Sequence, residues 1–425
     1  MTALSWASGV DTVLKSPRGA IGRIVHMSAI LGASNVLAAL MGLATSLVIA
    51  RGLGRDEFGR WIFCTAAVSA LTTAFDLGFG VLLTRDAARG AIGPLLAGAL
   101  ATRLALFLPF GLILYIAAPA VGVGAASAAS IHVGLAWAVA GIAYECVAAV
   151  FRTSPRRVLA IMTIETLGVA GRLVGAIVLI RRGVTIPGLL GLAAGLQLAQ
   201  LAAAFALWQI IAPTDHLARP SVRSAWTMLL RAFPFALTGL VANAQARIAP
   251  LMLGYLSSAG ETASFGVAWR IGVGARRLPQ AALSAGMPVF ARELQEGRPE
   301  SVRWKFDSML RAFAFAAAVA LVVLATPIVR MTYGPTFTAA SPALAWIGVG
   351  LVPWLINTNR KMHLYASGRE RAALRWSAAS LAIQSVGCVV LIPRLGAMGA
   401  AVALLIGEAF AWLPLRAEDT VTASW

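Results

Sequence analysis

Six arginines lie away from the ends of stretches of this sequence that are otherwise apolar enough to cross a membrane: Arg103, Arg172, Arg247, Arg270, Arg276 and Arg277. No lysine lies in these stretches. A charge at that depth in a bilayer is costly and implies a polar cavity or a charged partner. Guanidinium groups stay charged, bind phosphate oxygens in pairs and shed water more readily than ammonium groups. The pattern therefore predicts a site for a phosphate-bearing anion within the membrane.

The spacing of neighbouring residues predicts which arginines face this site, because residues three or four apart on a helix share a face. Three stripes combine arginine with polar or small residues: Asn243 and Arg247; Gly266, Arg270, Gly274 and Arg277; Gly168, Arg172 and Gly175. Small residues let a bulky ligand approach the backbone while the charges flank it. Snorkelling to lipid head groups is the alternative for a membrane arginine, and it is the interpretation we favour for Arg103.

Four carboxylates lie in the same apolar stretches: Asp76, Glu145, Glu165 and Glu408. A buried carboxylate has a raised pKa and can load and release a proton. Glu165, Glu145 and Asp76 are therefore candidates for carrying a coupling ion. They can equally be structural partners of the arginines, for example Glu145 or Glu165 with Arg172, and Asp76 in FDLGFG suits a turn or a contact between helices.

Other kinds of chemistry are not indicated. The sequence has no Walker A loop, and its Gly-x-Gly stretches at 122–128 and 271–277 follow no predicted strand. The four histidines are isolated from one another and the three cysteines are far apart, without metal-ligand spacing. We therefore expect no cofactor, no metal site and no catalytic triad.

Composition places the chain in a membrane. Hydrophobic residues make up 59% of its 425 residues and charged residues only 12%, with a mean hydropathy of +0.81. No soluble domain of this length needs so much apolar surface. The net charge of +18 could suggest nucleic acid. Basic residues in short loops between membrane spans determine topology instead, so we expect no nucleic-acid partner.

Twelve apolar runs reach the roughly 17–25 residues that a bilayer requires, which predicts an all-α polytopic membrane protein. The runs are 24–50, 58–84, 95–117, 130–151, 158–180, 187–211, 225–254, 262–290, 309–329, 338–359, 373–392 and 396–415. They group into an N-terminal segment (1–23), an N-lobe (24–211), a polar linker (212–224), a C-lobe (225–415) and a C-terminal tail (416–425).

Lysine and arginine predict the orientation, because loops rich in them stay in the cytoplasm. With the N-terminus inside, 22 of the 35 basic residues fall in inner segments, seven in outer loops and six within spans. Both termini are therefore expected in the cytoplasm. Residues 1–22 lack a clean apolar core and a cleavage site, so we expect no cleavable signal peptide.

The two halves of the chain resemble each other. The first contains IARGLGRDEFGRW (49–61) and the second MLGYLSSAGETASFGVAW (252–269). Both run from a long apolar span through a Leu-Gly pair and an acidic loop to a Phe-Gly pair. Six spans in each half is an even number, so both halves enter the membrane in the same orientation, and a pseudo-symmetry axis lies along the membrane normal. Such repeats are typical of transporters.

Six longer stretches, spread along the chain, are SNVLAALMGLATSLVIARGLGRDEFGRW, FDLGFGVLLTRDAARG, RAFPFALTGLVANAQ, GMPVFARELQEG, YGPTFTAASPALAWI and PRLGAMGAAVALLIGE. Together they resemble the bacterial oligosaccharide (O-antigen-type) flippases of the multidrug/oligosaccharidyl-lipid/polysaccharide exporter superfamily. This resemblance covers nearly the whole chain. It implies two six-helix lobes forming a V around a central cavity, and movement of a polyprenyl-pyrophosphate-linked glycan from the inner to the outer leaflet.

The resemblance further implies a secondary transporter of the bacterial cytoplasmic (inner) membrane, working by alternating access and not as an enzyme. Arg172, Arg247, Arg270 and Arg277 would hold the pyrophosphate, and Asn35, Asn243 and Gln245 would meet sugar hydroxyls. H⁺ or Na⁺ would be the coupling ion. We also expect a monomer that contacts membrane lipid and works beside polysaccharide polymerase machinery.

Three alternatives belong to other classes. A multidrug or cation antiporter of the same superfamily would need a cavity dominated by carboxylates or aromatic residues. A lipid II flippase typically has two further C-terminal spans. A membrane glycosyltransferase or polymerase would need acidic catalytic loops outside the membrane, and the outer loops predicted here hold few carboxylates beyond Asp56, Glu57 and Glu261.

Overall fold

The computed structural model describes residues 36–87, 92–118, 127–152, 155–211, 222–295, 300–366 and 369–423. All regular structure in these ranges is helical, which confirms the predicted all-α class. The predicted N-terminal segment 1–23, Asn35 and most of the linker 212–224 lie outside the described residues. In chain order the helices are Val36–Leu53, α3 (Arg55–Ala74), α4 (Phe79–Ala87), α5 (Ile92–Ala117), α6 (Ala128–Phe151), α7 (Pro155–Arg181), α8 (Ile186–Ile211), α9 (Val222–Leu256), α10 (Ala259–Gln295), α11 (Glu300–Val323), α12 (Ala325–Thr332), the 3-10 helix η2 (Pro335–Ala340), α13 (Ser341–Ala366) and α14 (Glu370–Ala423).

From residue 36 onward, the predicted spans fall on helical segments, but the 58–84 span is divided between α3 and α4 and the 309–329 span between α11 and α12. Within the described ranges, seven helices are long and apolar enough to cross a membrane, or eight if α11 and α12, which meet at 70°, form one bent span. Two predicted spans lie in α14, which is broken at Gly396, where φ is 52° and ψ is −128°. The more polar helices α3, α9 and α10 pack against one another, so their polar groups can avoid lipid.

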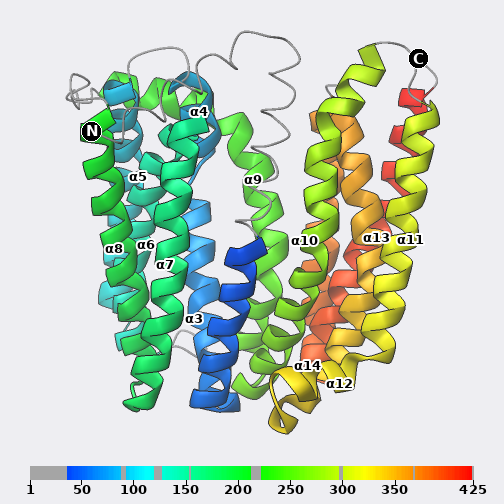
Figure 1. The fold of residues 1–425 in the computed structure, drawn as a ribbon, viewed down its shortest axis with the longest axis horizontal. Helices are drawn as coiled ribbons and strands as arrows, with labels where there is room; N and C mark the ends of the chain where they lie inside the picture. Colours follow the sequence, from blue (N-terminus) through cyan, green and yellow to red (C-terminus); the bar gives the residue numbers. More distant parts are fainter. Residues whose placement is uncertain are drawn as a thin grey trace, which may run out of the picture.

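The helices form two groups that follow the two halves of the sequence (Figure 1). α3 to α8 make up one group and α10 to α14 the other, with α9 between them. The first part of α9 packs on the first half, because Met228 shares a buried core with Phe79 and Leu96. Its second part packs on α14, where the amide nitrogen of Gln245 donates to the hydroxyl of Ser380 at 3.1 Å.

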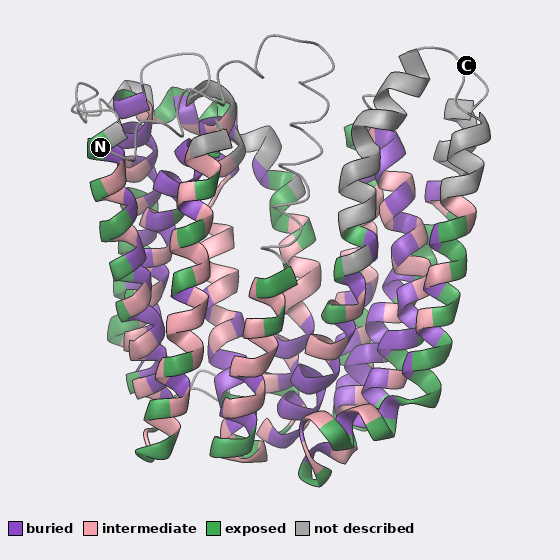
Figure 2. Cartoon of the chain, in the orientation of Figure 1, coloured by how far each residue is buried: buried purple, intermediate pink, exposed green. Residues whose placement is uncertain are grey.

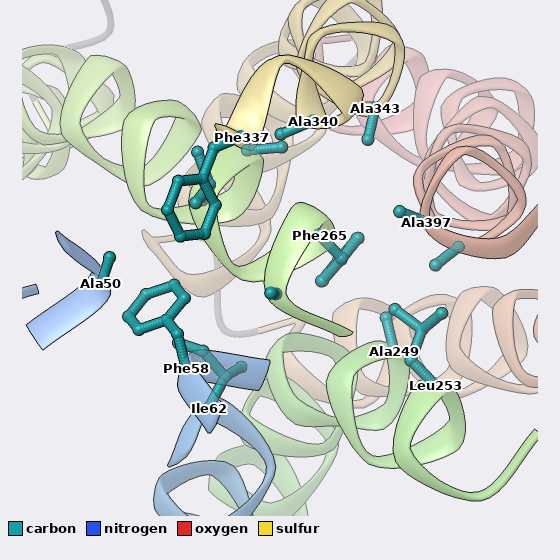
Figure 3. Close-up of a cluster of buried hydrophobic side chains, with 14 of the residues drawn as sticks. Ala50, Phe58, Ile62, Ala249, Leu253, Phe265, Phe337, Ala340, Ala343 and Ala397 are labelled. Carbon is teal, nitrogen blue, oxygen red and sulfur yellow. The ribbon is translucent and has the colours of Figure 1, made fainter. Parts of the chain in front are cut away.

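The two groups join through an apolar core at the lower end of Figure 1, which we call the closed end. The side chains drawn in Figure 3 come from both halves of the chain. Phe58 of α3 meets Phe337 of η2 edge-on, with 5.8 Å between ring centroids. Both phenylalanines of the sequence repeat, Phe58 and Phe265, are buried in this core.

The glycines of the repeat allow α3 and α10 to approach each other. A Cβ atom at Gly59 would collide with the carbonyl oxygen of Ala259 at the start of α10. A Cβ at Gly266 would lie 2.8 Å from a side-chain carbon of Ile62 on α3. The repeated Phe-Gly pair therefore places an aromatic ring in the core and leaves room for the other half beside it.

Polar contacts at the closed end also join the two halves. The Glu261 carboxylate accepts from the Arg55 guanidinium of the first half at 3.3 Å and from the Ala397 backbone N–H of α14 at 2.7 Å. We call these three residues the Glu261 clasp. Arg55 also donates to the backbone oxygen of Gly260 and to the hydroxyl of Ser264, both at 3.2 Å. The clasp thus connects α3, α10 and the break in α14.

Large apolar side chains cover the outward faces of both groups. Ile113 on α5 and Val323 on α11 are 66% and 69% exposed. Figure 2 shows such exposed residues along the outer helices and buried residues gathered where the groups meet. An apolar surface of this extent requires a lipid environment, so the chain is a polytopic membrane protein.

Candidate functional site

Arg247 and Arg270 lie close together where the two halves meet. Arg247 is nine residues before the end of α9 and Arg270 is eleven after the start of α10. At 1.5 Å per residue, both lie roughly 15 Å from the closed end, about half the thickness of a bilayer core. Their charges repel each other. Neither forms an ion pair with a carboxylate of the described residues, and the Nε atom of Arg247 is buried without a hydrogen-bond partner there.

The surroundings of Arg270 come from both halves of the chain. Its guanidinium carbon lies 4.9 Å from the ring centroid of Trp61 on α3, a cation–π contact. The hydroxyl of Tyr333, beside η2, is close enough to interact electrostatically with Arg270. It also hydrogen-bonds the Ser46 hydroxyl of the first half at 3.1 Å. Arg270 is therefore held by neutral aromatic and hydroxyl groups, which leave its charge uncompensated.

The stripe of small and basic residues on α10 leads away from the closed end. Gly266 packs against Ile62, whereas a Cβ atom at Gly274 would meet nothing within 4 Å. Arg277, one turn beyond Gly274, is exposed. On α9, Gly239 likewise faces open space on the face of Asn243 and Arg247. Both stripes therefore run from packed contacts between the halves to open surface.

Arg172 on α7 lies at a similar depth, nine residues before the end of its helix. It interacts electrostatically with Tyr144 on α6 but forms no ion pair with a carboxylate of the described residues. Its guanidinium is thus a third charge at mid-depth without an acidic partner in the described part of the chain.

The two described polar candidates differ in their contacts. The amide of Asn243 donates to the backbone oxygen of Gly239 at 3.0 Å, one turn back on its own helix. The amide nitrogen of Gln245 is used in the contact with Ser380, and its backbone oxygen accepts from Gln384 at 3.0 Å. Gln245 therefore joins α9 to α14.

Glu145 and Glu165 share one guanidinium. Arg152, directly after α6, lies 3.5 Å from Glu145 and 3.4 Å from Glu165. The hydroxyl of Tyr144 donates to Glu165 at 3.5 Å. The partner of both carboxylates is therefore Arg152, which follows α6 in sequence, and not Arg172. Two carboxylates facing one guanidinium leave a local negative charge that a cation or a proton can neutralise.

The snorkelling interpretation of Arg103 is wrong, because this residue is buried with 0% exposure. Its guanidinium lies 3.3 Å from the Asp76 carboxylate, 2.9 Å from the Phe75 backbone oxygen and 3.1 Å from the Cys146 sulfur. Asp76 sits in the break between α3 and α4, where Leu77 has a φ of 49°. Arg103 stabilises this break by pairing with the backbone and the carboxylate that end α3. The geometry favours a structural role for Asp76.

Arg276 lies inside the second half. Only 6% exposed, it is placed between the rings of Trp269 and Trp354, at 4.9 and 4.5 Å from their centroids. Glu408 attracts it electrostatically, and the Glu408 carboxylate accepts from the Asn357 amide at 2.9 Å. Arg276 therefore faces α13, away from the stripe of Arg270 and Arg277.

Residues 24–293 match the sequence profile of the polysaccharide biosynthesis protein family. The chain belongs to this family. No curated protein sequence matches this member of the family. The family match covers the first half and the start of the second half, including α9 and most of α10. Arg172, Arg247, Arg270 and Arg277 all fall within it.

Solved structures share the fold of this family member. The lipid II flippase MurJ in an inward closed conformation matches with a TM-score of 0.74 and 15% identity, over 92% of this chain and 87% of that chain. An inward-facing multidrug resistance transporter of the MATE family, within the MOP superfamily, matches with a TM-score of 0.66 and 15% identity, over 91% of this chain and 96% of that chain. A MOP superfamily transporter from Pyrococcus furiosus, described as having a binding pocket of reverse polarity, matches with a TM-score of 0.58 and 18% identity, over 97% of this chain and 98% of that chain.

The family member therefore has the fold of the MOP superfamily flippases and transporters. Its site also contains residues that sequence reasoning did not select, namely Trp61, Tyr333 and Ser46 around Arg270. Trp61 and Ser46 lie in a stretch that carries the family resemblance, but nothing in their spacing indicates contact with residues more than 200 positions away. Only the packing of the two halves reveals them.

Proposed function

We propose that this protein moves a polyprenyl-pyrophosphate-linked oligosaccharide from the inner to the outer leaflet of the bacterial cytoplasmic membrane. The observation that carries the proposal is the pair Arg247 and Arg270, two neighbouring guanidiniums at mid-depth without an acidic partner in the described part of the chain. Two uncompensated like charges favour a ligand with at least two negative charges. A pyrophosphate meets this requirement, and guanidiniums bind its oxygens in pairs.

The stripes on α9 and α10 give the ligand a route. Gly239 and Gly274 leave open space beside the arginines, so a bulky head group can approach while its polyprenyl chain stays in lipid. Arg277, further along the α10 stripe, would receive the head group before it reaches Arg270. Asn243 would meet sugar hydroxyls through its free amide oxygen.

The orientation follows from the basic residues. Basic residues such as Arg152, Arg157, Lys361 and Arg371 lie at helix ends opposite the closed end, which supports a cytoplasmic location for that end. The closed end then faces outward and the site is reached from inside. Transport would proceed by rocking of the two halves about the arginines, with Glu145, Arg152 and Glu165 as the site that takes up H⁺ or Na⁺.

Flipping measured in liposomes tests the proposal. A fluorescent polyprenyl-pyrophosphate glycan is supplied in one leaflet, and its arrival in the other is followed with a membrane-impermeant quencher. Removing one charge-assisted contact lowers affinity by about 10- to 100-fold. Arg247→Ala, Arg270→Ala and Arg277→Ala should therefore abolish flipping at low substrate concentration, whereas the exposed Arg182→Gln, beyond the end of α7, serves as the matched control. Full activity of all three folded variants would disprove the assignment.

Lipid II is the second candidate substrate. The similarity to the lipid II flippase MurJ favours it, and the same arginines can bind its pyrophosphate. Competition between unlabelled lipid II and the labelled oligosaccharide lipid decides between the two. A multidrug or cation antiporter fits less well, because Arg247 and Arg270 repel a cationic substrate.

A further inference from the structure

Arg270 is linked to the core of the closed end through a chain of aromatic rings. Its guanidinium stacks on Trp61, whose ring stacks on Phe58 with 5.6 Å between centroids. Phe58 in turn contacts Phe337 and Tyr333 of the second half, at 5.8 and 6.3 Å. Because Trp61 belongs to α3 and Arg270 to α10, this cation–π contact is itself a bond between the two halves.

An anion bound to Arg270 would compete with Trp61 for it. A cation–π contact stabilises a cation by its attraction to the ring face, and a phosphate oxygen neutralises that cation. The N–H donors of a guanidinium lie in its plane, so an anion that binds them in pairs sets the orientation of that plane and with it the contact with the Trp61 ring face. Repulsion from Arg247 adds to this tendency, because a dianion between the two arginines relieves it.

We propose that Trp61 is a positioning residue which holds Arg270 while the site is empty and releases it when an anionic head group binds, thereby loosening the closed end. This inference rests on the proposed function, since it assumes that Arg270 binds the head group. The cation–π contact between Trp61 and Arg270 is lost when the anion binds. This loss couples occupation of the site to opening of the closed end. An empty site keeps the bond and keeps the closed end shut.

The test uses the full chain in nanodiscs with inorganic pyrophosphate as the probe. Binding is measured by calorimetry, and opening by the distance between spin labels at two exposed closed-end positions, Arg182→Cys in the first half and Arg330→Cys in the second. The native cysteines, all buried, are replaced by alanine. Pyrophosphate should lengthen the distance between the labels in the parent protein.

Variants at Trp61 separate positioning from packing. Trp61→Leu removes the ring, so pyrophosphate should bind about three- to tenfold more tightly and the labels should move apart even without it. Trp61→Phe keeps a ring against Phe58 and should give an intermediate affinity. Trp269→Leu is the matched control, because Trp269 contacts Arg276 at the same 4.9 Å but within α10.

The outcomes distinguish the two proposals. If Arg270→Gln weakens pyrophosphate binding but both Trp61 variants bind it as the parent does or more weakly, Trp61 acts only by packing and the inference is overturned while the proposed function stands. An unchanged label distance in the parent protein on saturation overturns the inference in the same way. If Arg270→Gln binds pyrophosphate like the parent, both proposals fail.

Discussion

Replacing Glu261 by alanine should open the closed end. The substitution removes the ion pair with Arg55, in which both side chains are 33% exposed, and such partly exposed pairs contribute about 0.2–1 kcal/mol. It also removes the hydrogen bond from the Ala397 N–H at 2.7 Å, and a bond to a charged acceptor contributes about 1.5–3 kcal/mol. Together these losses come to about 1.7–4 kcal/mol, or roughly a 20- to 850-fold shift toward a state in which α3, α10 and α14 separate.

The spin-label pair at positions 182 and 330 measures this shift as the fraction of long distances. Glu57→Ala is a suitable control, because Glu57 forms an ion pair of 2.7 Å with Arg60 on the same helix and joins no second element. Glu261→Gln keeps an acceptor for the Ala397 N–H and should produce a smaller shift than Glu261→Ala. If Glu261→Ala gives the same distance distribution as Glu57→Ala, the clasp does not hold the halves together and the reasoning is refuted.

Three further predictions concern other parts of the molecule. Gly59→Leu should prevent α3 and α10 from approaching, so the labelled ends should stay apart and flipping should stop; a normal flipping rate would contradict this. Arg103→Leu should lower the free energy of unfolding by about 2–4 kcal/mol, because the substitution leaves the Asp76 carboxylate and the Phe75 carbonyl without their partner. Thermal unfolding in detergent measures this loss, with Arg182→Gln as the control. Glu165→Gln should remove the dependence of flipping on an ion gradient, and a variant that still responds like the parent would exclude this carboxylate as the coupling site.

Much of the fold could be predicted from the sequence. Hydrophobicity over some 20 residues is a local property, and in a bilayer every backbone polar group must be satisfied within its own helix, so apolar runs predict spans reliably. The 373–392 and 396–415 runs predict two separate spans, and α14 breaks between them at Gly396. The Phe-Gly repeat predicts equivalent positions in the two halves, and Phe58 and Phe265 are both buried in the core at the closed end.

The role of each arginine could not be predicted in this way. Arg103 and Arg247 both appear in the sequence as single charges in apolar runs, yet Arg103 is paired with Asp76 at the end of another helix, 27 residues away. Arg276 and Arg277 are adjacent, yet one lies between two tryptophans and the other is exposed. The sequence allows Glu145 or Glu165 to pair with Arg172, but both carboxylates lie beside Arg152.

The sequence by itself determined the class of protein, the positions of the spans and the residue types that can bind an anion, because hydropathy and charge depend only on composition along the chain. The tertiary structure alone decided which charges are compensated. Whether a charge is compensated depends on distances of a few ångströms between helices that are remote in sequence, such as those that bring Trp61 to Arg270 and Arg55 to Glu261. The residue spacing within one helix does not determine these distances.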